Sequence, residues 1–478
     1  MPTDFDLVAI GGGAAGLVAA GMASLLGAKT ALVEKHRLGG DCTWTGCVPS
    51  KTLLHAAKLA HNCRIAGRYG ILAGAVQVDF RSVIGKVRHT REHLYEEADA
   101  PPNMEKLGVR VIPAEARFLD PHTVELTDSA GRATRLTSRY FVIATGSRPK
   151  TPQANAPLLT NESIFEIDEQ PRRLLILGAG PIAVEMAQAF VRLGSEVTIV
   201  APDERILPRD DQELAIQLQD ALRAEGVQFS LKHIAAKIDK GASETVATLD
   251  DDSTIGCDAV LAAIGREPIL EGLDLAKAGV KFGKKGIEID SHCRTSQRHI
   301  YASGDVTGKF LFTHMAEHMS KVAVSNAILH LPRKLDEAHV PWCTYADPEL
   351  AHVGASEESL RTDGHYQHDI YRFAFSHIDR ATTEGETAGM VKVLANHRGK
   401  ILGATILGAN AGEMIAEYAL AMKNGLTLAN IADTIHPYPT YALGNRQAAD
   451  EWYTKKLTPG LIRTLRLVFR YRGSASAK

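Results

Sequence analysis

The chain carries the same alternation of apolar and small residues twice. In each copy, a run of β-branched apolar residues is followed by a glycine cluster, an alanine-rich stretch with helical spacing, and a second apolar run. The first copy occupies residues 5–34 and the second residues 174–200. A strand, a glycine turn and a helix that leads to a second strand form the unit that binds dinucleotides. The sequence therefore predicts two such units.

The segments outside these units predict further strands and helices. The region after the first copy is charged with helical spacing and then alternates as strands do, and two later apolar runs each end at a glycine. Beyond residue 341, strands and helices alternate without another glycine cluster. The segments are 79–103 (helical), 109–128 (strands), 140–143, which ends at Ala144-Thr145-Gly146, and 257–264, which ends at Gly265.

A chain of 478 residues is long enough for about three domains, each with its own core. We predict an α/β fold with two Rossmann-like dinucleotide-binding domains and an α+β C-terminal dimerisation domain. The predicted boundaries are 1–150 for the first domain, 151–270 for the second, 271–335 for a segment that completes the first, and 336–478 for the interface domain.

Composition and net charge make some functions less plausible, among them nucleic-acid binding and secretion. The chain is 45% hydrophobic and 23% charged, and its net charge is −2, which gives no long-range field to attract nucleic acid. A small-molecule or metal-ion substrate is the expectation. Six cysteines are too few for a secreted disulfide scaffold and favour a reducing compartment. Residues 7–28 are uncharged, but acidic residues precede them and glycines divide them, so we expect neither a signal peptide nor a membrane span and predict a cytoplasmic protein.

The two glycine clusters carry the nucleotide-binding chemistry. Glycines let the backbone approach a pyrophosphate at a helix N-terminus, and a later acid can hold the ribose hydroxyls. In the second unit, Ala201 stands where an acid selective for NAD is expected, and Arg205 and Arg209 follow. This favours NADPH, with NADH still open and a solvated role for Arg205 as the alternative. The motif residues are Gly11, Gly13, Gly16 and Glu34 in the first unit, and Gly178, Gly180 and Ala183 in the second.

A third motif, residues 39–51 with the sequence GGDCTWTGCVPSK, contains Cys42 and Cys47. Two cysteines with four residues between them can form a disulfide if the first turn of a helix brings them together, and a thiolate at a helix N-terminus has a lowered pKa. This suits reversible redox chemistry. The alternatives are a zinc half-site or two core thiols, but the chain has no second cysteine pair to complete a metal site, and we assign none.

Together with Ser303-Gly304-Asp305 and the stretch 178–185, these motifs resemble the pyridine nucleotide disulfide oxidoreductases. That family includes glutathione reductase, dihydrolipoamide dehydrogenase and mercuric reductase, and the resemblance spans essentially the whole chain. It implies a homodimer that binds FAD and takes hydride from a nicotinamide. It further implies that Cys47 is the charge-transfer thiolate at the flavin and that Cys42 is the thiol that meets substrate.

The resemblance also assigns roles to residues outside the cysteine pair. It implies that Lys51 pairs with Glu185 near the flavin, that Asp305 binds the ribityl chain and that Ala116 contacts the adenine. Thr145, Gly146 and Gly265 complete the predicted cofactor-binding set, with Lys51 and Glu185 also counted in it.

The chain departs from the family where an acid–base pair is expected. Members that reduce disulfides carry a His-Pro-Thr segment followed by a glutamate, whereas Tyr438 and Leu443 occupy those two places here. A tyrosine with a pKa near 10 is poorly suited to protonate a thiol product. This favours a role similar to mercuric reductase, although the terminal cysteine pair of that enzyme is missing. His436 is an alternative acid–base group. The candidate catalytic residues are Cys42, Cys47, Lys51, Glu185, Tyr438 and His436.

The function predicted on this basis is NAD(P)H-dependent reduction of a thiol-reactive substrate, Hg(II) or a related soft metal ion. Alternatives are reduction of a small-molecule disulfide, a flavin oxidase or quinone reductase, and a redox sensor. Residues 461–472 predict a helix with leucines and aromatic residues on one face and arginines on another. This helix could contact an anionic membrane surface, but the pattern leads us to favour packing against the partner subunit.

Overall fold

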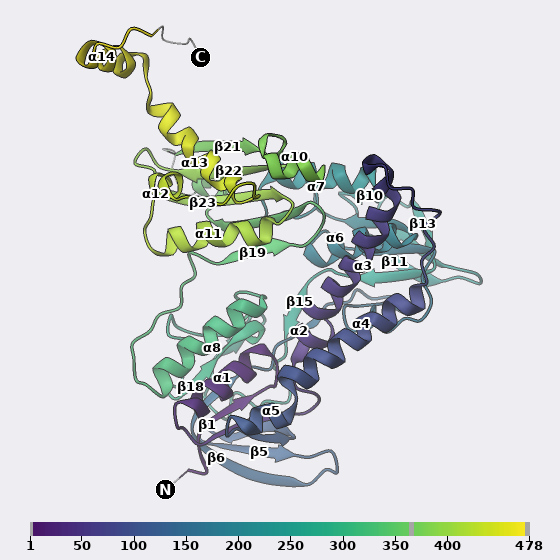
Figure 1. Cartoon of the computed structure of the whole chain (residues 1–478). Helices are drawn as coiled ribbons and strands as arrows, with labels where there is room; N and C mark the ends of the chain where they lie inside the picture. Colours follow the sequence, from purple (N-terminus) through teal and green to yellow (C-terminus); the bar gives the residue numbers. More distant parts are fainter. Residues whose placement is uncertain (1–2, 363–367, 474–478) are drawn as a thin grey trace. The chain divides into compact units, whose positions relative to one another are not determined.

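The computed structural model describes residues 3–362 and 368–473. These residues divide into two compact units, which we treat separately. Unit 1 comprises Met1–Glu204 and Arg223–Asp336, and unit 2 comprises Arg205–Leu222 and Glu337–Lys478. Figure 1 shows the course of the chain.

The first sheet of unit 1 has the order β3-β2-β1-β6-β5-β4, and β18 pairs with the free side of β6. The strands β1, β2, β3, β6 and β18 run parallel, whereas β4 and β5 form an antiparallel extension of β6. The strands β1, β2 and β18 are almost fully buried, as strands covered on both faces must be, whereas the edge strand β3 has no buried residue. Their bounds are β1 (Phe5–Ile10), β2 (Thr30–Glu34), β3 (Arg110–Pro113), β4 (Glu115–Asp120), β5 (Thr123–Thr127), β6 (Ala133–Ile143) and β18 (Ile300–Ala302).

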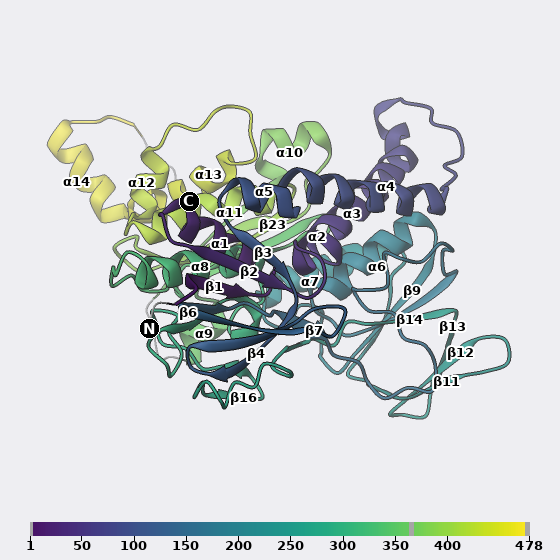
Figure 2. The ribbon, with the colours of Figure 1, turned by 90° about the horizontal axis from the view of Figure 1, so that it is seen from below.

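Helices cover this sheet and carry the cysteine motif. The helices α1 and α8 pack against each other, as Figure 1 shows, and α3 packs against α4 in both Figure 1 and Figure 2. The helical prediction for 79–103 is met by α4, a π-helical turn and the start of α5, and the strand prediction for 109–128 by β3, β4 and β5. The bounds are α1 (Ala14–Leu25), α2 (Gly40–Trp44), α3 (Cys47–Ile65), α4 (Phe80–Leu94), α5 (Pro101–Lys106) and α8 (Thr313–Ala327).

The second parallel sheet of unit 1 has the order β10-β9-β8-β14, and α6 packs on β8 and β9. An antiparallel sheet of order β11-β12-β13 follows it, and the short strands β7 and β15 pair with each other, as do β16 and β17. The bounds are β7 (Ser147–Pro149), β8 (Arg173–Leu177), α6 (Pro181–Leu193), β9 (Glu196–Ala201), β10 (Gln228–Leu231), β11 (Ala235–Lys240), β12 (Thr245–Leu249), β13 (Thr254–Cys257), β14 (Ala259–Ala262), β15 (Arg266–Pro268), β16 (Phe282–Gly283) and β17 (Gly286–Ile287).

Unit 2 is built on an antiparallel sheet of order β19-β20-β23-β22-β21. The helix α11 packs on β20 and β23, and α13 packs on β21 and β22. The last helix, α14, has no buried residue. The bounds are β19 (Pro341–Thr344), β20 (Glu349–Gly354), α9 (Glu357–Thr362), β21 (Asp369–Ala374), α10 (Asp379–Glu384), β22 (Met390–Ala395), β23 (Ile401–Gly408), α11 (Ala411–Lys423), α12 (Leu428–Asp433), α13 (Leu443–Lys456) and α14 (Pro459–Phe469); α7 (Gln212–Ala224) begins in unit 2.

Two details differ from the sequence expectations. Cys42 and Cys47 do not share the first turn of one helix, because Cys42 lies in α2 whereas Cys47 is the first residue of α3. The C-terminal helix ends at Phe469, since Arg470 adopts a left-handed conformation with a φ of 57° and caps it. The sequence pattern predicts Arg470 on one helix face with Arg463 and Arg466, but Arg470 lies outside the helix.

Candidate redox and dinucleotide-binding sites

The two cysteines of the motif have thiol pKa values that are shifted in opposite directions. A hydrogen bond from the Cys42 thiol lowers the pKa of Cys47 to about 6, helped by the Thr313 hydroxyl at 3.3 Å from the sulfur and by the charge of Lys51. The same hydrogen bond, together with burial, raises the pKa of Cys42. Cys47 also begins a helix whose N-cap, Gly46, offers no side-chain partner to the first amides, and that helix end favours an anion. With both thiols reduced, Cys47 holds the negative charge and Cys42 the proton.

Lys51 follows one turn after Cys47 on α3 and meets a buried acid on α6. Its Nζ lies 2.9 Å from one carboxylate oxygen of Glu185 and 3.2 Å from the other. Only 5% of Glu185 is exposed, so the ammonium of Lys51 pairs with a carboxylate that is shielded from solvent. The structure thus brings together the pair that the resemblance implies, and its role beside a flavin stays a prediction.

The first glycine cluster forms a turn that tolerates no side chain. Gly11 has a φ of 106°, and a Cβ there would lie 2.3 Å from the carbonyl oxygen of Ala144. A Cβ on Gly16 would lie 1.8 Å from the carbonyl oxygen of Gly11. Gly13 is the N-cap of α1 and makes no side-chain cap hydrogen bond, which leaves the first amides of the helix available to a phosphate.

Glu34 ends β2 next to this turn. One carboxylate oxygen accepts a hydrogen bond from the Gly12 amide at 2.6 Å, and the other accepts one from the His36 amide at 2.7 Å. The carboxylate is therefore fixed beside the glycine turn while retaining acceptor capacity for ribose hydroxyls. Ala116, predicted to contact the adenine, is buried on β4.

The second glycine cluster repeats this geometry. Gly178 has a φ of 109°, and a Cβ there would lie 2.4 Å from the carbonyl oxygen of Ala263. Gly180 is the N-cap of α6, again without a side-chain cap, and Ala183 is fully buried in the first turns of that helix. Gly265, which follows β14, has a φ of 114°. Both dinucleotide-binding segments of unit 1 therefore present an uncapped helix end behind a glycine turn.

Arg205 is held by its own loop. Its guanidinium donates hydrogen bonds to the backbone carbonyl oxygens of Ile206 at 3.2 Å and of Pro208 and Asp210 at 3.0 Å. A guanidinium has five N–H donors, and most of them serve this loop. The predicted contact of Arg205 with a 2′-phosphate stays a prediction, and Arg209 is exposed in the same loop.

Arg266 connects the cysteine motif to the predicted ribityl-binding acid. Its guanidinium pairs with Asp41, the residue before Cys42, and donates to Ser147 at 2.7 Å and to Asn161 at 3.0 Å. Ser147 in turn donates to Asp305 at 2.6 Å. Burial raises the pKa of Asp305, whereas the Ser147 hydroxyl and the Arg266 charge lower it. The predicted turn after β6 also lies near this network. Gly146 in this turn has a φ of 73°, and the Thr145 hydroxyl donates a hydrogen bond to the Ile269 carbonyl oxygen at 2.9 Å.

Comparison with known proteins agrees with this geometry. Residues 5–320 match the family model described as pyridine nucleotide-disulphide oxidoreductase, and residues 340–448 match the dimerisation domain of the same family. The chain belongs to the pyridine nucleotide-disulphide oxidoreductase family. The resemblance inferred from the motifs and the predicted fold class are both confirmed.

Relatives in this family have different substrates. The chain is 32% identical to dihydrolipoyl dehydrogenase of Bacillus subtilis over 469 residues, which cover 94% of this chain and 98% of that protein. It is 33% identical to mercuric reductase of Staphylococcus aureus, with 93% of this chain and 82% of that protein covered. Among solved structures, it is similar to the Cu(II) complex of the HOCl-induced flavoprotein disulfide reductase RclA from Escherichia coli, with a TM-score of 0.84, 26% identity, and coverage of 94% and 100% of the two chains.

Members of the pyridine nucleotide-disulphide oxidoreductase family depend on FAD and use NAD(P)H, and the residues of unit 1 fit FAD. The turn at Gly11 and the uncapped start of α1 suit a pyrophosphate, Glu34 is fixed beside them, and the half-buried Asp305 accepts a hydrogen bond from Ser147 while keeping acceptor capacity for a ribityl hydroxyl. The match to the dimerisation domain supports a homodimer. No helix among the described residues is long and apolar enough to cross a membrane.

The segment that carries the family's acid–base pair has an unusual arrangement here. Both ring nitrogens of His436 face acceptors: Nδ1 lies 2.9 Å from the Thr434 carbonyl oxygen, and Nε2 lies 2.8 Å from the carboxylate of Glu417. The exposed Tyr438 hydroxyl donates to Asp379 at 2.8 Å, and this carboxylate raises the pKa of Tyr438. Both ring nitrogens of His436 are therefore engaged by groups of this chain, while Tyr438 keeps its proton near neutral pH.

Sequence reasoning missed three functional side chains. Thr313 and Arg266 lie more than 200 residues from Cys47 and Asp41, their respective partners, and Glu417 comes from a helix outside the motif that contains His436. Of these three residues, only Arg266 could have been singled out from the sequence, because it directly follows Gly265, the predicted strand-end glycine. The place of the expected glutamate is taken by Leu443, which is buried at the start of α13.

Proposed function

We propose that this protein uses NAD(P)H to reduce a soft, thiol-binding metal ion at Cys42 and Cys47, with Hg(II) as the first candidate and Cu(II) as the second. The observation that carries the proposal is the state of Tyr438 and His436. Reduction of a disulfide substrate ends with protonation of a thiolate leaving group, which needs an acid with a pKa near the working pH. Tyr438 has a raised pKa and His436 is bound on both nitrogens. Reduction of a metal ion requires no such acid.

The cysteine pair has the properties that a metal ion needs. Soft thiolates bind soft ions, and metal binding displaces a thiol proton. Cys47 is already the anionic partner, and Cys42 loses its proton when the ion binds. An exposed Cys47 and a half-buried Cys42 let an ion reach both sulfurs. The relatives support the same class, because they include a mercuric reductase and a flavoprotein disulfide reductase solved with Cu(II).

The electrons balance over one cycle. A hydride from NAD(P)H carries two electrons, and bound FAD would supply the redox chemistry that links this hydride to the disulfide of Cys42 and Cys47. The bond between Cys42 and Cys47 breaks, which leaves a thiol on Cys42 and a thiolate on Cys47. After the ion displaces the Cys42 proton, two electrons reduce one Hg(II) to Hg(0), or two Cu(II) to two Cu(I), and the disulfide forms again. Net, one NAD(P)H is oxidised and one proton is released for each pair of electrons.

NADPH is the proposed donor. Ala201 leaves the end of β9 without the carboxylate that would repel a 2′-phosphate, and Arg209 is exposed a few residues on. A ratio of kcat/KM values that favours NADH over NADPH would contradict this preference without affecting the substrate proposal.

The test is NADPH oxidation by the holoenzyme with Hg(II), Cu(II), oxidised glutathione, lipoamide and a quinone offered separately. We expect turnover with a metal ion, a loss of at least about a thousandfold in Cys42→Ser because one of the two redox sulfurs is gone, and full activity in Cys63→Ser. Cys63 is an exposed thiol on α3 and serves as the matched control for nonspecific metal binding.

The same assay separates the alternatives. Preferred turnover of glutathione or lipoamide would overturn the metal-ion proposal in favour of a disulfide substrate. Quinone turnover that is equal in wild type and Cys42→Ser would remove the cysteines from the function. Bound FAD without NADPH consumption for any acceptor would indicate a redox sensor.

A further inference from the structure

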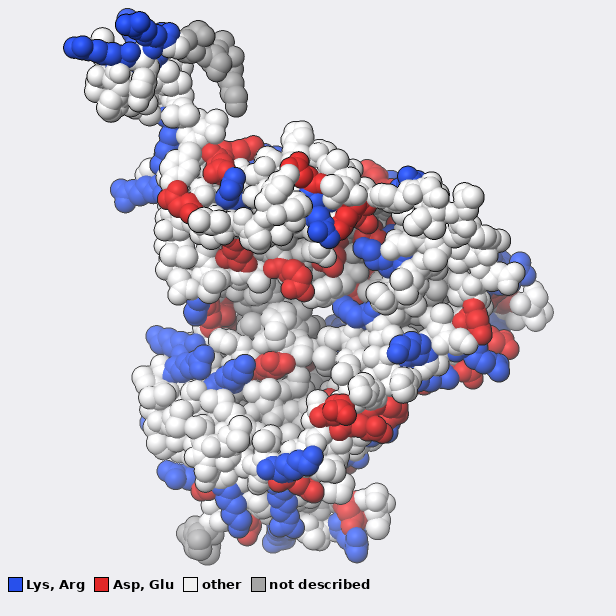
Figure 3. Space-filling view, viewed as in Figure 1, with Lys and Arg blue, Asp and Glu red and all other residues white. Residues whose placement is uncertain are grey.

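The C-terminal end of the chain is positively charged, whereas the chain as a whole is close to neutral. The whole chain has 54 basic and 56 acidic residues. After Glu451, however, it contains no acidic residue. Figure 3 shows the same bias on α14, where blue side chains gather without red ones beside them. The basic residues of this end are Lys455, Lys456, Arg463, Arg466, Arg470, Arg472 and Lys478, the last outside the described residues.

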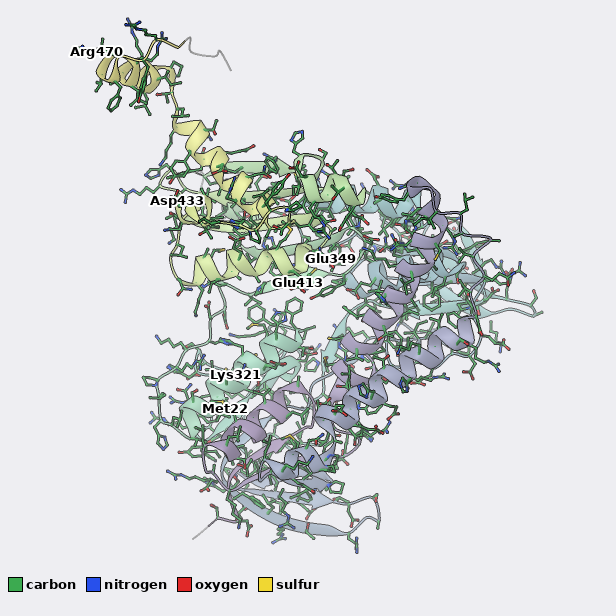
Figure 4. The ribbon with its side chains drawn as sticks, in the orientation of Figure 1. Met22, Lys321, Glu349, Glu413, Asp433 and Arg470 are labelled. Carbon is green, nitrogen blue, oxygen red and sulfur yellow. The ribbon has the colours of Figure 1, made fainter. Side chains whose placement is uncertain are left out.

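The helix α14 within this end is amphipathic and uncovered. At 100° per residue, Arg463 lies with Leu467 on the side of the helix opposite its apolar face, and Arg466 lies at the edge of that face. None of its residues is buried, and 63% of Val468 and 58% of Phe469 are exposed. Figure 4 shows its side chains, with Arg470 labelled, projecting from the helix with no other element of unit 2 over them. The apolar face consists of Leu461, Ile462, Leu465, Val468 and Phe469.

We propose that α14 lies on the surface of an anionic phospholipid bilayer, with its apolar face toward the acyl chains and its arginines at the headgroups. A short helix with one apolar and one basic face suits this position. The 11 residues of α14 are far fewer than the roughly 20 that a span needs. Phe469 and Tyr471 place aromatic rings at the end of the helix, where the membrane interface favours them.

A second copy of the chain fits this helix less well than a bilayer does. The match to the family's dimerisation domain ends at residue 448, before α14 begins at Pro459, so the family interface does not account for the helix. Pairing α14 with its own copy through the apolar faces would also leave the arginines without an acidic partner on either helix, since α14 contains no acidic residue. Anionic headgroups neutralise them instead. The location of α14 outside the dimerisation-domain match and its lack of acidic residues therefore favour an anionic bilayer over the partner subunit.

The test is co-sedimentation of the holoenzyme with vesicles of phosphatidylcholine alone or mixed with phosphatidylglycerol. We expect binding to the anionic vesicles only, and its loss at high salt. Each basic residue near the surface contributes about a fivefold gain in partitioning, so Arg463→Glu combined with Arg466→Glu should weaken binding by at least about 25-fold. Phe469→Ser should weaken it too. Arg68→Glu combined with Arg81→Glu is the charge-matched control, since both arginines are exposed in unit 1.

Three outcomes would overturn the proposal. The first is equal binding to both kinds of vesicle, and the second is no binding to anionic vesicles. The third is dissociation of the dimer in the Arg463→Glu and Arg466→Glu variant, measured by sedimentation velocity, which would assign the helix to a second copy of the chain. NADPH oxidation without vesicles should be the same in the wild type and every α14 variant, so the outcome is independent of the proposed substrate.

Discussion

The hydroxyl of Thr313 should help to keep the pKa of Cys47 low, in addition to the larger effect of the Cys42 thiol. The Thr313 oxygen lies 3.3 Å from the Cys47 sulfur and donates when Cys47 is a thiolate. Thr313→Val keeps the shape of the side chain and removes this donor. A hydrogen bond to a charged group stabilises it by about 1.5–3 kcal/mol, and the lower end applies because sulfur is a weak acceptor. Since one pKa unit corresponds to about 1.4 kcal/mol, the pKa of Cys47 should rise from about 6 to about 7.

The assay is the pH dependence of iodoacetamide alkylation of the NADPH-reduced enzyme, with the labelled cysteine identified by mass spectrometry. Only the thiolate reacts. At pH 6 the thiolate fraction of Cys47 should fall from about one half to about one tenth, so alkylation should slow about fivefold, while rates at pH 9 should agree. Thr52→Val is the control, because the Thr52 hydroxyl bonds to the Val48 carbonyl oxygen of its own helix. An unchanged midpoint in Thr313→Val would refute the role of this hydrogen bond.

Three further substitutions test other parts of the structure. Lys392→Met should lower the free energy of unfolding by about 3–5 kcal/mol, because Asp211, 2.7 Å from Lys392 Nζ, would remain buried without its cation; urea denaturation measures this, and a loss below about 1 kcal/mol would contradict it. Arg266→Met should leave Asp41 without its cationic partner and lower the temperature of FAD release in a flavin-fluorescence melt, and an unchanged release temperature would argue against a role for Arg266 in holding the flavin site. Gly178→Ala puts a Cβ 2.4 Å from a backbone carbonyl oxygen, so KM for NADPH should rise at least about tenfold with FAD content unchanged, and loss of FAD instead would contradict the assignment of this turn.

The sequence alone determined the features that depend on local backbone geometry. A glycine turn between a strand and a helix restricts φ and the approach of neighbouring atoms within a few residues, so Gly11 and Gly178 could be recognised without a structure. The spacing of Cys42 and Cys47 is local in the same sense. These motifs were enough to identify the family and the fold class, because their combination is rarer than any one of them.

Tertiary structure alone decided which side chains meet across long separations. Arg266 pairs with Asp41 over 225 positions and Thr313 bonds to Cys47 over 266, and no periodicity in the chain encodes such contacts. The same holds for His436, whose partner Glu417 is supplied by the packing of another helix. Sequence could name these residue types, but the proton affinities that govern the chemistry depend on neighbours within a few ångströms, and only the folded chain brings those neighbours together.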